Sequence, residues 1–163
     1  MNNVLISACL LGKRVRYDEN ALTVTDKILN EWLSDGRVVS ICPEVAADMC
    51  IPRPPAEISK GDGRDVLAGN ATVIESTGID VTDHFKSGAQ IALSLCQKNN
   101  IKIAVLAESS PSCGSSTIYD GSFSGEKIVG FGVTAALLIK NGIQVFNQYE
   151  MVAANKALQR TSR

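Results

Sequence analysis

The feature that most constrains the fold of this chain is an alternation of short strand-like runs with longer helical patterns. The strand-like runs are short, apolar and rich in β-branched residues, and they lie at 4–6, 38–41, 101–107 and 143–146. Helical patterns lie at 25–33, 82–99 and 132–140. This order predicts an α/β fold with a mainly parallel, Rossmann-like sheet flanked by helices. The length of 163 residues fits a single domain over 1–163.

Two of the helical patterns carry clear local signals. Thr25 is placed to cap the first helix at its N-terminus, and Gly36 is placed to end it. In the 82–99 pattern an apolar stripe ends at Cys96, so we expect this cysteine to lie in the core.

Two segments contain no such pattern. Residues 52–69 hold several Pro and Gly and predict a mostly irregular surface segment. Residues 109–130 form a long loop rich in Ser, Gly and Asp. Because long irregular loops are uncommon in compact domains unless they are functional, we expect a site there.

Composition and charge exclude several function classes. The 16 basic and 17 acidic residues show no basic excess, so a nucleic-acid partner is not expected. No apolar run approaches the roughly 18 residues of a membrane span, and no basic region opens a signal peptide. We therefore expect a soluble cytoplasmic protein that acts on a small molecule.

The five cysteines do not form a disulfide framework. Their number is odd, no CxxC pair occurs, and His84 is the only histidine. Thioredoxin-type redox motifs, zinc ribbons and His-rich metal sites are excluded. What remains is a set of dispersed thiols.

Three of these thiols follow the first three predicted strands. Cys9 and Cys42 come just after the first two strands, and Cys113 lies six residues beyond the third. Since ligands of parallel sheets bind outside the carboxyl ends of the strands, the three thiols are expected to converge. Converging thiolates suggest a soft metal.

The spacing leaves the kind of site open. An iron–sulfur cubane can accept three Cys and leave one iron open as a Lewis acid. A zinc ion would need a fourth ligand, for which Asp48 or Cys50 is the candidate. All three cysteines could also fill the core as small apolar residues.

Short motifs spread over nearly the whole chain resemble the DUF523 family. They include SACLLG at 7–12, CPEV at 42–45, PRPPAEI at 52–58, SPSCG at 110–114 and GVTAA at 132–136. Members of this family include thiouracil desulfidases, whose [4Fe-4S] cluster is held by three Cys. The resemblance implies an enzyme that removes sulfur from a thiolated pyrimidine such as thiouracil, giving uracil and sulfide.

The resemblance also implies roles for individual residues. Cys9, Cys42 and Cys113 become the cluster ligands. In the family a Glu and a Ser near the open iron support catalysis, and these carry over to Glu44 and Ser110. Ser109 and Ser112 lie beside Ser110 and are alternatives.

The chain departs from the family pattern at two places. Residues 46–50 read AADMC where the family has a Gly-rich turn, so Cys50 competes with Cys42 as a ligand. Glu108 and Ser109 stand where the family often has a basic residue. The loss of that positive charge favours a free thiolated base over an anionic nucleotide.

We therefore expect a non-redox hydrolysis in which Glu44 is the general base on a water and Ser110 orients that water. Glu44 could instead be a charge at a helix N-terminus. Arg16 and Arg53 are either substrate contacts or solvated loop residues. Residues 130–132 could cradle a phosphate, but a turn that begins a helix fits them better.

Two other functions are compatible with these residues. A cysteine- or zinc-dependent hydrolase with Cys113 as nucleophile would need an activating base, and His84 lies at the start of a predicted helix with no motif around it. A cluster-based sensor or a small-ligand binding domain would not be an enzyme, and a sensor more often holds its cluster with four Cys.

Overall fold

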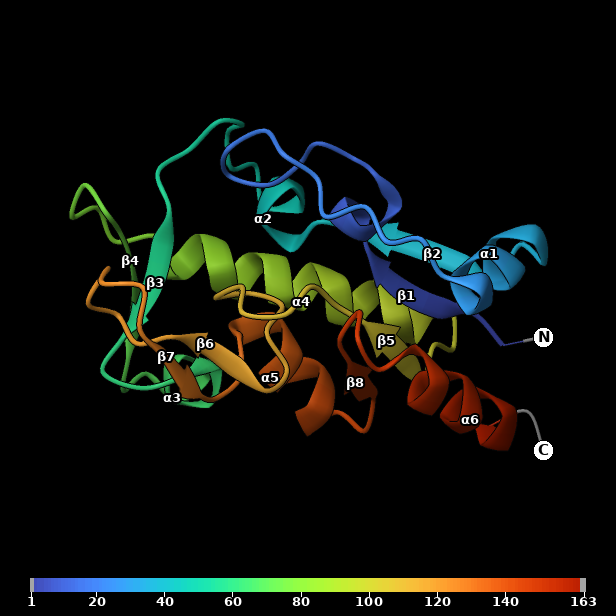
Figure 1. Ribbon diagram of the computed structural model, residues 1–163. Helices are drawn as coiled ribbons and strands as arrows, with labels where there is room; N and C mark the ends of the chain where they lie inside the picture. The colour runs from blue at the N-terminus through green and yellow to red at the C-terminus, as the bar shows by residue number, and fades with distance from the viewer. Residues whose placement is uncertain (1, 162–163) are drawn as a thin grey trace.

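Four parallel strands form the central sheet of the computed structural model, which describes residues 2–161 (Figure 1). Their order is β2-β1-β5-β8, and their bounds are Val38–Ile41, Val4–Ser7, Ile103–Val105 and Gln144–Phe146. Val4 lies opposite Val38 on one side and Ile103 on the other. Strand β2 is therefore added on one side of β1, and the later strands β5 and β8 are added on the other side. The strand order reverses at β1, as in doubly wound folds. The predicted mainly parallel α/β sheet is confirmed.

Helices cover both faces of this sheet (Figure 1). On one face α1 (Lys27–Ser34) packs against α6 (Met151–Thr161). On the other, α4 (Thr82–Lys98) packs against α5 (Val133–Lys140). The sequence patterns predicted α1, α4 and α5 but not α6.

The start of α1 differs by one residue from the expectation. Asp26, not Thr25, is the N-cap, and its carboxylate accepts hydrogen bonds from the amides of Ile28 at 2.8 Å and Leu29 at 3.2 Å. A carboxylate both accepts these bonds and matches the positive end of the helix dipole.

The segment expected to be irregular contains regular structure. Strand β3 (Ala56–Ser59) pairs antiparallel with β4 (Thr72–Glu75), and α3 (Gly63–Ala68) connects them. Asp62 caps α3 in a capping box with Asp65. The prolines end just before β3, so they mark its beginning rather than the absence of structure.

The long loop after β5 carries a small hairpin. Strands β6 (Thr117–Tyr119) and β7 (Lys127–Val129) pair antiparallel within the segment expected to be a loop. Two short helices complete the fold, a 3₁₀ helix η1 (Ala8–Leu11) after β1 and α2 (Pro43–Ala46) after β2.

The buried apolar side chains form two clusters. One surrounds the parallel sheet, and the other joins β3, β4, α3 and β6. Helix α4 crosses both, since Phe85 and Ala89 belong to the second cluster and Ala92 and Cys96 to the first. The apolar stripe predicted for this helix is therefore buried as expected. In the described residues, no helix combines the length and apolar character that a membrane crossing requires.

Candidate active site

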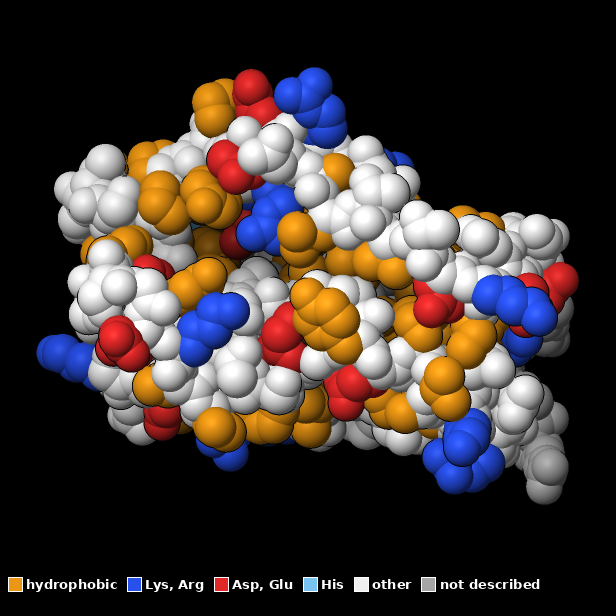
Figure 2. Space-filling view, in the orientation of Figure 1, with side chains coloured by type: hydrophobic (Ala, Val, Ile, Leu, Met, Phe, Trp, Pro, Cys, Tyr) orange, Lys and Arg blue, Asp and Glu red, His pale blue; other side chains and the backbone are white. Residues whose placement is uncertain are grey.

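A cavity of about 440 Å³ opens at the carboxyl edge of the sheet. Its walls come from the segments after β1, β2 and β5, together with residues of β3 and the β6–β7 hairpin. Figure 2 shows the molecule hollowed on this face, between the upper loops and the hairpin below. The position is the crevice that a reversal of strand order creates.

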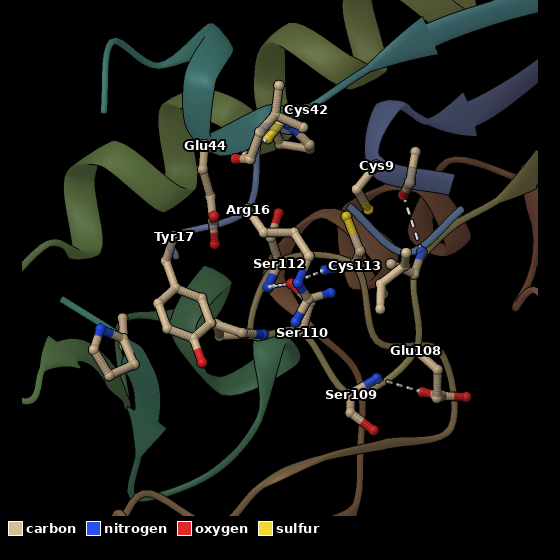
Figure 3. A pocket seen from close by; sticks show the side chains of 18 of the residues that line it. Cys9, Arg16, Tyr17, Cys42, Glu44, Glu108, Ser109, Ser110, Ser112 and Cys113 are labelled. Atoms are coloured by element: carbon tan, nitrogen blue, oxygen red, sulfur yellow. Dashed lines mark hydrogen bonds between the residues drawn. The ribbon is translucent and has the colours of Figure 1, made fainter. Parts of the chain in front are cut away.

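Three cysteines line this cavity from three different segments (Figure 3). Cys9 lies in η1 directly after β1, and Cys42 is the N-cap of α2 directly after β2. Cys113 comes from the loop between β5 and β6. Cys9 and Cys113 are buried, and Cys42 is half-buried. The structure thus brings together the three thiols that the strand ends predicted to converge.

The N-terminus of α5 holds the loop that carries Cys113. The amides of Gly132, Val133 and Thr134 donate to carbonyls of that loop, each at 2.8 Å. These acceptors are the carbonyls of Gly114, Pro111 and Ser112, respectively. The amides at the start of the helix are therefore occupied by protein, and residues 130–132 begin a helix rather than cradle a phosphate.

A glycine is needed for this close approach. A Cβ on Gly132 would lie 2.4 Å from the carbonyl of Ser112, far inside van der Waals contact. The Ser112 hydroxyl is also buried and bonded to Thr134 Oγ1 at 2.8 Å. Ser112 therefore belongs to the contact between loop and helix.

The other two candidate serines differ in their contacts. Ser110 Oγ accepts hydrogen bonds from the amides of Ser112 at 3.1 Å and Cys113 at 3.2 Å. Because both bonds use the oxygen as acceptor, the hydroxyl proton remains free to donate. Ser109 Oγ instead pairs with Thr117 Oγ1 at 3.1 Å.

Glu108 binds the ends of the same loop together. Its Oε1 accepts from the amides of Ser109 at 3.0 Å and of Ser115, Ser116 and Thr117 at 3.2 Å each. Its Oε2 accepts from Ser116 Oγ and Asn147 Nδ2. Burial would raise the pKa of Glu108, but the bond from Ser116 and the backbone amides lower it to about 2. The negative charge of Glu108 is therefore surrounded by hydrogen-bond donors of its own loop.

Glu44 enters the cavity from the first turn of α2 (Figure 3). Its Oε2 pairs with Arg53 Nη2. Arg53 also donates to the carbonyls of Cys50 at 3.0 Å and Val15 at 3.2 Å. Arg53 is buried, so it is not the solvated loop residue that one interpretation of the sequence expected.

The three thiols have raised pKa values. Burial raises the pKa of Cys9, and the neighbouring Arg16 partly opposes this. Burial also raises the pKa of Cys42, while a hydrogen bond from the backbone amide of Val45 lowers it in part. For Cys113 burial again raises the pKa, a hydrogen bond from Ser7 lowers it, and the thiols of Cys42 and Cys9 raise it further.

This donor set fits a metal cluster. Two buried thiols and one half-buried thiol, which oppose one another's ionisation, need positive charge among them to become thiolates. In residues 2–161, no group of three or more Cys, His, Asp or Glu side chains is placed to hold a single metal ion. A four-iron cluster is larger than one ion and takes thiols that stand further apart.

The remaining cysteines and the histidine lie outside the cavity lining. Cys50 is exposed, and Cys96 is buried in α4, where burial raises its pKa to about 11. His84 Nδ1 lies 3.1 Å from the carbonyl of Ala47. His84 is therefore not placed as a base for Cys113.

Comparison with known proteins agrees with this site. The family model described as 2-thiouracil desulfurase matches residues 4–150. The chain belongs to the 2-thiouracil desulfurase family. It is 40% identical over 148 residues to the uncharacterized protein YbbK of Bacillus subtilis strain 168, covering 91% of this chain and 97% of that protein.

A solved structure is also similar. The [4Fe-4S]-dependent thiouracil desulfidase TudS superposes with a TM-score of 0.89 at 40% identity, over 98% of this chain and 99% of TudS. Family membership confirms the resemblance seen in the motifs and the prediction of a desulfidase-type enzyme. The cluster predicted for this chain agrees with the one named for TudS.

Proposed function

We propose that this protein hydrolyses the thiocarbonyl of a thiolated pyrimidine such as thiouracil. Water supplies the oxygen of the product carbonyl, and the sulfur leaves as hydrogen sulfide, so no electrons are exchanged. The observation that supports this is the convergence of three thiols, a carboxylate and a hydroxyl on one cavity.

Cys9, Cys42 and Cys113 are the residues that would hold a [4Fe-4S] cluster. When bound by three thiolates, such a cluster supplies an open iron that acts as a Lewis acid toward soft sulfur. All five cysteines are free in the structure, which suits the reducing conditions of the cytoplasm.

Glu44 would act as the general base. It projects into the cavity from the same helix turn that follows Cys42 (Figure 3). Arg53 occupies only its Oε2. Oε1 is the atom that would take a proton from water during attack on the thiocarbonyl carbon. The proton would then pass to the departing sulfur.

Ser110 would orient the reactants. Two backbone amides fix its oxygen, so its hydroxyl proton is the group left to donate. A donor fixed before the reaction stabilises charge that develops on a water or carbonyl oxygen without reorganising.

The substrate is proposed to be a small thiolated base. The wall of the cavity includes the rings of Tyr17 and Tyr119, which offer flat surfaces to a planar heterocycle. Lys127 lies over the Tyr119 ring, with its Nζ 5.4 Å from the ring centre.

The test is anaerobic purification followed by measurement of iron, acid-labile sulfide and sulfide release from 4-thiouracil. We expect about four irons and four sulfides per chain, as a [4Fe-4S] cluster requires. Replacing any of the three cavity cysteines by Ser should abolish iron binding, while Cys50→Ser should leave it unchanged. One zinc per chain without sulfide would contradict the proposal.

Glu44→Gln tests the base separately. This variant should retain full iron content and lose turnover by about 10²-fold or more, as expected when a general base is removed. Unchanged turnover at full iron content would remove Glu44 from the mechanism.

A further inference from the structure

Arg53 is a buried cation in the wall of the active-site cavity. Only 4% of its side chain is exposed, although it lies in a proline-rich loop between α2 and β3. An arginine is rarely buried unless its guanidinium is fully paired. The contacts of the guanidinium therefore show which segments Arg53 holds in place.

The guanidinium joins segments that are far apart in the sequence. Its Nη2 donates to Glu44 Oε2 and, at 3.2 Å, to the carbonyl of Val15. Its Nη1 donates to the carbonyl of Cys50 at 3.0 Å. The planar fork of an arginine suits several fixed acceptors at once, whereas a lysine presents one compact charge.

The same contacts reach a proposed cluster-ligand position and the segment of Val15 and Tyr17. The Val15 carbonyl that accepts from Arg53 also lies 3.8 Å from Cys42 Sγ. The backbone amide of Arg53 donates to the carbonyl of Tyr17 at 2.7 Å. Arg53 therefore ties the segment of Val15 and Tyr17 to the segment of Cys42 and Glu44.

A direct contact with substrate fits these observations less well. The guanidinium is almost completely buried, and it is already paired with three protein acceptors. Arg16 lines the same cavity and is more exposed, so it is better placed to touch a ligand.

We propose that Arg53 is a positioning residue that fixes the direction of the Glu44 carboxylate. By holding Oε2, it directs Oε1 toward the cavity, where water attacks. This inference rests on the proposed function, because it assigns Arg53 a role through the proposed base. Since small displacements of a catalytic group cost about 10²-fold in rate, loss of Arg53 should lower kcat by a similar factor.

The first test compares Arg53→Gln with Arg53→Lys in anaerobically loaded enzyme. We expect full iron content in both, a KM within about threefold of the unmodified protein, and a fall in kcat of about 10²-fold for Gln and about tenfold for Lys. Arg64→Gln is the matched control, since Arg64 pairs with Asp62 at 3.0 Å, is 69% exposed and lies outside the cavity lining. Its kcat should be unchanged.

A double-mutant cycle then asks whether Arg53 acts through Glu44. If it does, the kcat of Arg53→Gln combined with Glu44→Gln should be no lower than that of Glu44→Gln alone. The same cycle in urea unfolding of the cluster-free protein should show effects that are non-additive by about tenfold in the unfolding constant. This second measurement needs neither cluster nor turnover.

Three results would overturn the proposal. A raised KM with unchanged kcat would make Arg53 a substrate contact, and iron loss in proportion to activity would make it a support for the cluster. Additive effects on kcat would show that it acts independently of Glu44. If instead the unmodified enzyme releases no sulfide, the proposed function fails, while the unfolding cycle still tests the pairing of Arg53 with Glu44.

Discussion

Replacing Glu108 by Gln should destabilise the protein in a pH-dependent way. The carboxylate accepts four backbone amides on Oε1 and two side-chain donors on Oε2. A glutamine retains one oxygen acceptor but presents an NH₂ group where the carboxylate has its second oxygen. That NH₂ would face the amide of Asn147, which also donates.

The pKa of Glu108 sets the size of the effect. Burial would raise this pKa, but the bonds from Ser116 and the amides lower it from 4.5 to about 2. This lowering of the pKa corresponds to about 3 kcal/mol, at 1.36 kcal/mol for each tenfold change in the acid dissociation constant. Because the side chain is partly solvated, screening reduces this to about 1–2 kcal/mol of unfolding free energy at pH 7.

The direction of the pH dependence follows from the lowered pKa. A carboxylate whose pKa is lower in the folded state contributes its stability above the unfolded value and loses it as pH falls toward the folded value. The contribution of Glu108 should therefore be complete at pH 7 and decline between about pH 4.5 and pH 2. The variant lacks this titration, so its difference from the unmodified protein should shrink by about half at pH 3.

Urea unfolding of the reduced, cluster-free protein at pH 7 and pH 3 measures this difference. Glu126→Gln is the matched control, because Glu126 is an exposed acid next to the β6–β7 hairpin and its carboxylate has no hydrogen bond to the described residues. The same stability loss at both pH values would refute the electrostatic reasoning. No loss at pH 7 would refute the structural role of Glu108.

Two glycines give further predictions. In Gly88→Ala the new Cβ would lie 2.3 Å from the carbonyl of Pro43 and should force α4 away from α2. The unfolding free energy, measured by urea titration, should therefore fall by about 1–3 kcal/mol. Ser87→Ala, on the exposed side of α4, is the control and should have little effect in the same titration. Gly132→Ala should displace the Ser112 carbonyl and so lower iron content per chain; normal iron content would show that Cys113 does not depend on this contact.

The sequence predicts the central sheet well because its signals are local. Each parallel strand is a short buried run, and the segments that follow β1, β2 and β5 must meet at one edge. The convergence of Cys9, Cys42 and Cys113 could therefore be predicted from the positions of the strands. Strand β3 and helix α3 could not, because the prolines before Ala56 and the glycines around Asp62 suggest irregular chain when they actually mark where elements begin.

Polar contacts between residues that are far apart in the sequence could not be predicted from local sequence patterns. The role proposed for Arg53 depends on its contacts with Glu44 and with the carbonyl of Val15, which lies 38 residues away in the sequence. A charged loop residue is usually solvated, so no local signal marked Arg53 as buried.

The two networks divide the site into halves that can be perturbed separately. Glu108 holds the loop that presents Cys113 and Ser110, and Arg53 holds the carboxylate of Glu44 against the carbonyl of Val15. Loss of Glu108 frees the loop that carries a cluster-ligand position, so it should act mainly on iron content. Loss of Arg53 leaves Cys42 fixed at the start of α2 and changes chiefly the direction of a carboxylate, so it should act mainly on kcat. A protein in which both substitutions lowered iron and kcat in the same proportion would have one cooperative site instead of two supports.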